Sequence, residues 1–436
     1  MIQTVAIVGG GYSGAMLAVR LAEAGLRAAL VNRTADFGLG VAYSTPCDRH
    51  LLNVRSGRMS ARADDPNHFV RWLERTHPAL ADPEGFAPRR IFGLYVQETL
   101  KAAVAAHPGA IEAFVGEAVA VEDGGVRLAD GRRIAADAVV LATGNPPPRV
   151  GDAVPGVIRD PWAPGALDVV GPDDEVVIVG TGLTMIDMVL MLDARGWTGR
   201  ATAISRRGLV PRGHDATQVR VAARRPASGP LSRRLNAARK AARTDGWAVM
   251  MDRLRDLNAE LWAELSEAER ARFLRHLRPW WDVHRHRVAC EPAARIRALM
   301  DAGRLTVAAG RLKAMEAVEG GVTVRWRPRG ASADQTMRAA HVIDCTGPGH
   351  DPLRAQDALT RQLLESGRAR PAPLGLGLEV DVQGRVIGAD GRPSGLLMLG
   401  PPALSAFWET VAVPDIRKRI EEVVAGLKGQ GRAARA

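Results

Sequence analysis

The chain has 436 residues, of which 46% are hydrophobic and 25% charged, and its formal net charge is +11. This length predicts two domains, and no run approaches the ~20 apolar residues of a membrane helix, so we expect a cytoplasmic protein without membrane contact. Three widely separated cysteines exclude a disulfide framework and a dithiol redox centre. The arginines are spread along the chain, which argues against nucleic acid as a partner.

A glycine cluster follows the first apolar run of the chain. In VAIVGGGYSGAML (residues 5–17), a β-rich segment leads into glycines and then into a helical pattern. Gly9, Gly11 and Gly14 form a GxGxxG fingerprint: the first permits the turn, the second lets the backbone approach a pyrophosphate, and the third allows close helix–strand packing. A second strand, residues 28–31, follows at the βαβ distance. We therefore predict a dinucleotide at the N-terminus of this helix.

The second strand ends in Asn32 and Arg33, where dinucleotide-binding folds place an acidic residue for the ribose hydroxyls. An asparagine can hydrogen-bond a hydroxyl, although without the charge assistance of a carboxylate. We predict that Asn32 and Arg33 contact the cofactor. The alternative is that Asn32 is only a turn residue.

Two further strands end in a Thr-Gly pair. One lies in DAVVLATGN and ends at Thr143 and Gly144, and the other lies in HVIDCTGPG near residue 345. A glycine at this place lets the chain leave a parallel strand close to a ligand. Each pair alone is an ordinary turn, but together with two glycine turns they indicate one architecture, in which Thr143 and Gly144 approach a cofactor.

A second glycine turn lies in the middle of the chain. DEVVIVGTGLTMIDMVLML repeats the strand, turn and helix, with Gly180 and Gly182 in the first two fingerprint positions and Met185 in the third. The next strand ends in Arg206 and Arg207, where NAD-selective proteins place an acid, and arginine there can pair with a 2′-phosphate. These residues predict NADPH rather than NADH. The residues expected to bind it are Gly180, Gly182, Leu183, Thr184, Arg206 and Arg207.

An Arg- and Trp-rich helical stretch follows and contains RPWWDVHRHR. Trp280 and Trp281 are candidates for stacking on an aromatic substrate, and the neighbouring arginines and histidines for neutralising an acidic one. The alternative is structural, with the tryptophans in an interdomain core and the arginines in ion pairs. A metal site at Asp282, His284 and His286 lacks the remaining ligands of a zinc centre, so we expect no metal.

The chain resembles the two-dinucleotide flavoproteins, and more closely the FAD/NAD(P)-binding family that includes bacterial FAD-dependent urate hydroxylases. The stretches that carry the likeness include GVAYSTPCDRHLLNVRSGRMSARADDPNHFVRWL, LATGNPPP, GTGLTMIDMVL, ISRRGLVPR, RFLRHLRPWWDVHRHR and FWETVAVPDIRKR. The resemblance implies that Gly9, Gly11, Ser13 and Gly14 hold the FAD pyrophosphate. It also implies a flavin side lined by residues 38–43, including Gly40, by Asn53 and Met59, and by the C-terminal segment containing Trp408.

The resemblance implies an α/β fold with two Rossmann-like domains, in which an FAD domain is interrupted by an NAD(P)H domain carrying a helical insertion. We expect the FAD domain at residues 1–160 and 335–436, and the NADPH domain at residues 161–334 with its insertion at about residues 225–303. The prolines and glycines of NPPPRVGDAVPG favour the first crossing between them.

The implied activity is that of an NADPH-dependent FAD monooxygenase, which uses reduced flavin and O2 to hydroxylate a small polar or heteroaromatic molecule. The alternatives are a flavoprotein reductase with another electron acceptor and a slow flavin-binding redox sensor. The sequence identifies neither a catalytic residue nor the substrate or oligomeric state.

Overall fold

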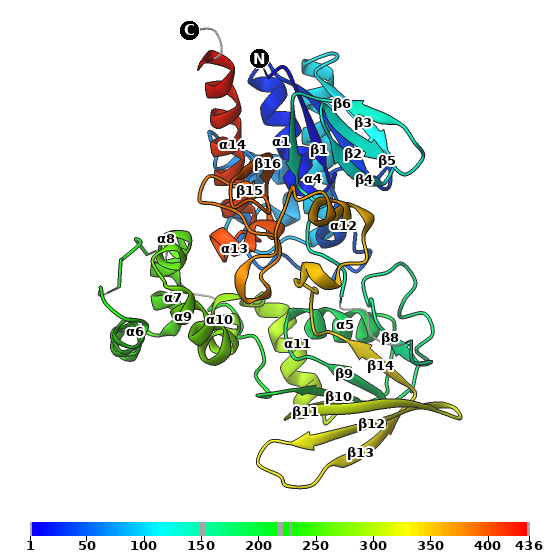
Figure 1. Cartoon of the computed structure of the whole chain (residues 1–436). Helices are drawn as coiled ribbons and strands as arrows, with labels where there is room; N and C mark the ends of the chain where they lie inside the picture. Colours follow the sequence, from blue (N-terminus) through cyan, green and yellow to red (C-terminus); the bar gives the residue numbers. More distant parts are fainter. Residues whose placement is uncertain (1, 149–152, 216–220, 227, 434–436) are drawn as a thin grey trace.

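The chain forms two large β-sheets, and helices cover each of them (Figure 1). The computed structural model describes residues 2–148, 153–215, 221–226 and 228–433. The chain starts in the first sheet, crosses to the second, and returns to the first for its last fifth. This arrangement is the discontinuous α/β architecture that the glycine motifs predict.

The first sheet has six strands in the order β15-β16-β7-β1-β2-β3. Strands β16, β7, β1, β2 and β3 pair in parallel, whereas the edge strand β15 is antiparallel to β16. The strands are β1 (Thr4–Val8), β2 (Arg27–Asn32), β3 (Ile111–Val115), β7 (Ala138–Leu141), β15 (Arg385–Ile387) and β16 (Pro393–Met398).

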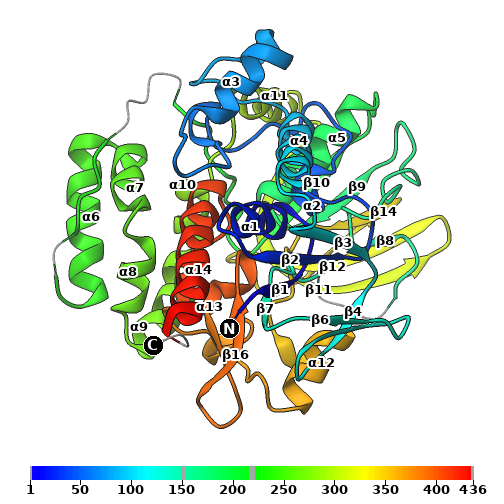
Figure 2. The ribbon, with the colours of Figure 1, turned by 90° about the horizontal axis from the view of Figure 1, so that it is seen from above.

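Helices cover one face of this sheet, and a small antiparallel sheet with a further helix covers the other. Alternating residues of β1 divide between the two cores: Val5 and Ile7 enter the first, and Ala6 and Val8 the second. The first face carries α1 (Tyr12–Glu23), α3 (His68–Thr76), α4 (Arg89–Ala106) and α14 (Val413–Ala433), seen from above in Figure 2. The second carries β4 (Ala118–Glu122), β5 (Gly125–Leu128), β6 (Arg133–Ala135), α12 (Ala358–Glu365) and α13 (Leu404–Phe407).

The second sheet has seven strands in the order β13-β12-β11-β10-β9-β14-β8. Strands β8 to β11 and β14 pair in parallel, and β12 and β13 extend the sheet as an antiparallel edge. The strands are β8 (Val157–Ile158), β9 (Val176–Val179), β10 (Ala201–Ser205), β11 (Leu305–Val318), β12 (Gly321–Pro328), β13 (Gln335–Ala339) and β14 (His341–Asp344). Helices α5 (Leu183–Ala194) and α11 (Cys290–Asp301) pack on one face.

The predicted helical insertion interrupts the connection between the parallel strands β10 and β11. Its helices protrude beside both sheets in Figure 1. They are α6 (Leu231–Asp245), α7 (Trp247–Arg255), α8 (Asn258–Ala263), α9 (Glu267–Arg272), a π-helical turn (Phe273–Leu277) and α10 (Arg278–Arg285). The predicted end at residue 303 is too late, because α11 packs against α5 and β11 in the second core and is the ordinary crossover helix.

The two crossings between the sheets also differ from the expected boundaries. Strand β8 ends before residue 160 yet pairs with β14 in the second sheet. Strands β13 and β14 lie beyond residue 334 and belong to the same sheet. The return to the first sheet therefore follows Asp344 rather than residue 335. Sequence patterning missed this because β13 and β14 are short and carry no signal of the sheet they join.

Among the described helices, none combines the length and apolar character that a membrane span requires.

Candidate functional site

The first glycine turn brings three segments into contact at the end of β1. Gly9 has a φ of +114°, and a Cβ built on it would lie 2.2 Å from the carbonyl oxygen of Ala142 at the end of β7. A Cβ on Gly14 would lie 1.9 Å from the carbonyl oxygen of Gly9. Both glycines are therefore required by the fold itself, because α1 and β7 approach the turn more closely than any side chain allows.

Gly11 is different, because no feature of the described fold requires a glycine there. Its φ is −71° and it is the N-cap of α1, with no side chain capping the first amides of the helix. A Cβ on Gly11 would make only an ordinary contact with Gly40, at 3.5 Å. The open space beside Gly11 lies where the uncapped N–H groups of the helix point, which is an anion-binding arrangement.

Asn32 binds the turn itself. Its Oδ1 accepts a hydrogen bond from the backbone N–H of Gly10 at 3.1 Å, and its Nδ2 donates to the carbonyl of Thr34 at 2.9 Å. The asparagine thus stabilises the glycine turn in the place where an acidic residue was expected. Arg33 is exposed beside it.

A cleft of about 210 Å³ joins the ends of the central strands of the first sheet. It brings together five predicted residues, Gly9, Asn32, Arg33, Thr143 and Gly144. Sequence reasoning missed the opposite wall, which comes from segments after the return crossing. That wall includes Gly349, His350, Asp357, Thr360, Gly377 and Leu378. The Thr-Gly end of β14 was the only signal near it, and that signal does not reveal which cleft the following loop enters.

The segment at residues 38–43 lies beside the glycine turn. The N–H of Gly38 donates to the carbonyl of Gly10 at 2.7 Å, and Gly40 is the residue closest to Gly11. Ser13 is buried on the other side, where a Cβ on Gly400 would lie 2.7 Å from its hydroxyl oxygen. The C-terminal segment and residues 38–43 therefore approach the fingerprint from two directions.

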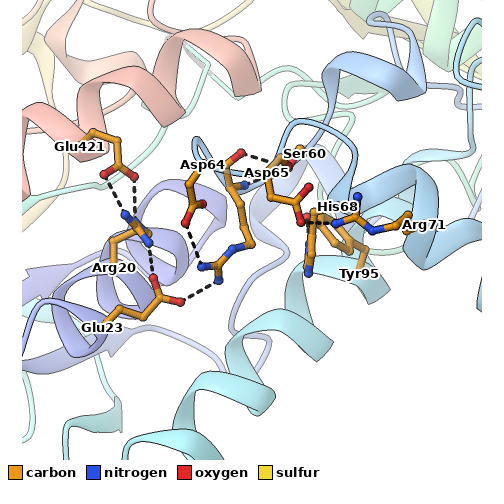
Figure 3. A network of polar contacts seen from close by, with 10 residues as sticks. Arg20, Glu23, Ser60, Asp64, Asp65, His68, Arg71, Tyr95 and Glu421 are labelled. Carbon is orange, nitrogen blue, oxygen red and sulfur yellow. Dashed lines mark hydrogen bonds and ion pairs between the residues drawn. The ribbon is translucent and has the colours of Figure 1, made fainter.

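The Met59 side chain is buried in the first domain. Only 2% of its surface is exposed, and it packs in the first hydrophobic core. The loop after it is held by hydrogen bonds: the Ala61 N–H donates to the Tyr95 hydroxyl at 3.0 Å, and Arg417 donates to the Ser60 carbonyl at 2.6 Å. Figure 3 shows part of this network, in which His68 contacts Tyr95. The flavin contact of Met59 stays a prediction, and the structure shows that its side chain also packs in the core.

The second glycine turn repeats the first. Gly180 has a φ of +111°, and a Cβ on it would lie 2.3 Å from the carbonyl oxygen of Cys345 at the end of β14. Gly182, the N-cap of α5, has no side-chain cap, and a Cβ added to it would meet no atom within 4 Å. Met185 is fully buried in the hydrophobic core between α5 and the second sheet. Helix α5 therefore accommodates a side chain at the position where α1 has Gly14. Leu183 and Thr184 form the first turn of α5 and are partly exposed.

Arg206 and Arg207 lie in a loop that is hydrogen-bonded to this turn. The Thr181 hydroxyl donates to the Leu209 carbonyl at 2.5 Å and lies 2.8 Å from the Ser205 hydroxyl. Ser205 ends β10 as Asn32 ends β2, and both bind the middle residue of their own glycine turn. Arg206 is exposed and Arg207 partly buried. This placement next to the α5 N-terminus is the one predicted for a 2′-phosphate contact.

Trp408 packs into the helical insertion. Its ring stacks on Trp262 with a centroid distance of 4.8 Å and meets Phe273 edge-on at 5.2 Å, and only 7% of the residue is exposed. Its φ of 54° is unusual for a non-glycine residue. Trp408 therefore joins the C-terminal segment to the insertion, and its flavin contact stays a prediction.

The next residue, Glu409, joins the same two parts. It accepts a hydrogen bond from Trp281 Nε1 at 2.6 Å and forms an ion pair with Arg285 at 2.8 Å. Burial alone would raise the pKa of Glu409, but Arg285 and His286 outweigh it and hold this pKa well below its usual range. These contacts of Trp281 and Arg285 agree with the structural interpretation of RPWWDVHRHR, whereas Trp280 is 46% exposed.

The metal interpretation of the same motif finds no support in the geometry. His284 stacks on Trp247 at 5.0 Å between ring centroids, whereas His286 lies 3.4 Å from Glu409. Within the described ranges, no group of three or more His, Cys, Asp or Glu side chains could hold a metal ion.

Known protein families and solved structures resemble this chain. Residues 6–146 match the family described as FAD-NAD(P)-binding. The fold is similar to that of ornithine N-hydroxylase from Kutzneria sp. 744, solved with reduced FAD, NADP+ and L-ornithine, at 17% identity and a TM-score of 0.66 over 99% of this chain and 100% of that one.

Two further solved structures show the same likeness. L-lysine 6-monooxygenase from Pseudomonas syringae has 15% identity and a TM-score of 0.66, covering 98% of this chain and 99% of its own. The FAD-bound cadaverine monooxygenase of Erwinia amylovora has 12% identity and a TM-score of 0.68, covering 98% of this chain and 95% of its own. The chain therefore has the two-dinucleotide-binding flavoprotein fold, with an FAD-NAD(P)-binding region at its N-terminus.

Proposed function

We propose that this chain is an NADPH-dependent FAD monooxygenase that hydroxylates a small polar or heteroaromatic molecule. The observation that carries the proposal is the repeated pair of glycine turns. In each turn the first glycine packs against the end of a strand that is followed by a Thr-Gly pair. The second glycine, Gly11 or Gly182, lies beside open space. A chain with two such turns on two sheets has the means to hold two dinucleotides.

FAD is assigned to the first sheet and NADPH to the second. The FAD-NAD(P)-binding family match covers residues 6–146, which include the first turn. The second turn is the one followed by Arg206 and Arg207, whose charge suits a 2′-phosphate. Gly9, Gly11, Ser13 and Gly14 would hold the FAD pyrophosphate, and Asn32, Arg33, Thr143 and Gly144 would line its path. Gly40 and Asn53 are proposed on the flavin side, and Gly180, Gly182, Leu183 and Thr184 at the NADPH phosphates.

The three similar proteins described above are one N-hydroxylase and two monooxygenases, and their names refer to ornithine, lysine and cadaverine. Their likeness to this chain supports the reaction class. In that reaction NADPH, a proton, O2 and the substrate give NADP+, water and the hydroxylated product, so the flavin supplies the oxygen chemistry. The chain itself would position the two cofactors and exclude water between them. More specifically, we propose that the chain belongs to the family that includes bacterial FAD-dependent urate hydroxylases.

The visible spectrum of the purified chain, recorded without oxygen before and after NADPH, tests the proposal. A flavin band that bleaches with NADPH supports both cofactor sites. Oxygen consumption then distinguishes the reaction classes: a monooxygenase consumes one O2 per NADPH and releases hydroxylated product when its substrate is present. Release of one peroxide per NADPH with every substrate tried, or rapid reduction of a quinone, would favour the reductase alternative. Protein purified without flavin that also fails to bind added FAD would refute the proposal.

A further inference from the structure

A second cavity, of about 260 Å³, lies at the junction of all three parts of the molecule. The first domain contributes Arg55 and Arg58, helix α7 of the insertion contributes Asp252 and Arg255, and the second domain contributes His214 and Arg287. The cavity adjoins the predicted flavin side, because His214 Nε2 donates to the carbonyl of Asn53 at 3.0 Å. Junctions between domains are common places for small-molecule sites.

Four arginines and two carboxylates line this cavity. Arg55 lies 3.4 Å from Glu84, and Arg287 forms an ion pair with Asp252. Both acidic side chains are thus matched by an arginine. Across the residues that the structure describes, Arg58 and Arg255 form neither an ion pair nor a side-chain hydrogen bond, so no carboxylate pairs directly with either guanidinium.

The protein holds these charges at an electrostatic cost. Burial and the neighbouring cations Arg285 and Arg58 together lower the pKa of Arg255 to about 10, although the carboxylates of Asp415 and Asp252 oppose the shift. Burial and Arg287 likewise lower the pKa of His214 to about 4, which leaves its ring neutral at neutral pH. A guanidinium that is kept desolvated near other cations gains from an incoming anion.

We propose that this cavity binds a small carboxylate and that Arg58 and Arg255 are its binding residues. A carboxylate matches the planar fork of each guanidinium and supplies the directly paired counter-charge that the chain lacks. The assignment of this carboxylate to the substrate rests on the proposed function, and it makes the molecule that is hydroxylated a small acid.

The test is binding to the full-length chain without NADPH. A panel of small carboxylates, each paired with its neutral amide (benzoate with benzamide, succinate with succinamide), is measured by thermal shift and calorimetry, with inorganic phosphate as a separate probe. We expect at least one carboxylate to bind more tightly than its amide. Each of Arg58→Gln and Arg255→Gln should weaken that binding about tenfold or more, as loss of a charged hydrogen bond predicts, whereas Arg133→Gln on the distant strand β6 should not.

The ligand-free stability of Arg255→Met provides a second readout. Methionine keeps much of the aliphatic packing and removes the unpaired charge, so this variant should melt at or above the wild-type temperature while losing carboxylate binding. Carboxylates that never exceed their amides, binding that survives in the Arg58→Gln/Arg255→Gln double variant, or stabilisation by phosphate alone would overturn the proposal. Because the binding test involves neither NADPH nor oxygen, a chain that binds a carboxylate but no FAD would refute the proposed function and leave this site standing.

Discussion

Arg89 at the start of α4 and Asp187 in the middle of α5 form a two-pronged ion pair between the two domains, with N–O distances of 2.8 and 3.0 Å. Both side chains are almost fully buried. The His50 ring adds a 2.8 Å contact to the carbonyl of Asp187. The two glycine turns therefore sit on bodies joined by a buried charged contact, which fixes one turn relative to the other.

Removing one partner of this ion pair should lower the free energy of unfolding more than replacing both partners with apolar residues. Asp187→Asn leaves Arg89 buried without its counter-charge, which typically costs about 3–5 kcal/mol. Arg89→Met with Asp187→Leu should recover much of that loss. Thermal and urea unfolding measure both, with Arg75→Gln, from the exposed pair with Glu98, as a near-neutral control. An Asp187→Asn protein as stable as the control would show that the contact is unimportant.

Gly11 and Gly182 offer a matched pair of substitutions. Neither backbone has a positive φ and neither lacks room for a Cβ, so both valine variants should fold. Gly11→Val should yield colourless protein because its side chain fills the proposed pyrophosphate space, whereas Gly182→Val should keep flavin and lose reduction by NADPH. Absorbance and anaerobic reduction measure the two effects. Full flavin content in Gly11→Val would contradict the assignment of the first turn.

Gly9→Ala serves as the contrasting case. Its Cβ would lie within 2.2 Å of a backbone oxygen, so this variant should lose stability whether or not FAD is present. Circular dichroism melting of protein stripped of flavin separates this folding defect from loss of cofactor binding.

Arg206→Ala with Arg207→Ala should change cofactor preference. Each charged hydrogen bond to a phosphate contributes about 1.5–3 kcal/mol, so the KM for NADPH should rise at least about tenfold while that for NADH changes little. Steady-state kinetics with both nucleotides measure the ratio. An equal rise for both would remove these arginines from 2′-phosphate recognition.

His214 should make the chain less stable in mild acid. Burial and Arg287 lower its pKa to about 4 from 6.5, so between these values the unfolded chain binds more protons than the folded one. The free energy of unfolding should therefore fall as pH drops from about 6.5 to about 4, by up to about 1.4 kcal/mol per pH unit.

The variant His214→Gln isolates this effect. Glutamine can still donate to the carbonyl of Asn53 but does not titrate, so the difference in unfolding free energy between wild type and variant should shrink or reverse below pH ~6.5. Urea titrations at several pH values measure it. Parallel pH dependence in the two proteins would mean that His214 does not titrate in this way.

Local patterns predicted the parts of the fold that depend on neighbouring residues. The strand, glycine and helix order placed Gly9 and Gly180 correctly, because a positive φ beside a parallel strand leaves a direct trace in the sequence. The core packing of Met59 and Trp408 was not predicted, because an apolar residue in a cofactor wall and one in a core look alike in a sequence. The cavity with Arg58 and Arg255 was missed because the two residues lie far apart in the chain, and only the docking of α7 on the first domain brings them together.

The insertion leaves and rejoins the second sheet within a single connection, between β10 and the crossover helix α11. The register of β10 with β11 and the glycine turn at Gly180 lie outside it. Lengthening, shortening or exchanging these helices would therefore change the cavity wall that contains Arg255 and the contact of Trp262 with Trp408. The strand order of both sheets would stay the same. We infer that substrate specificity can change through this one segment. Chimaeras in which the segment is exchanged at its two ends are a practical way to transfer specificity between related chains.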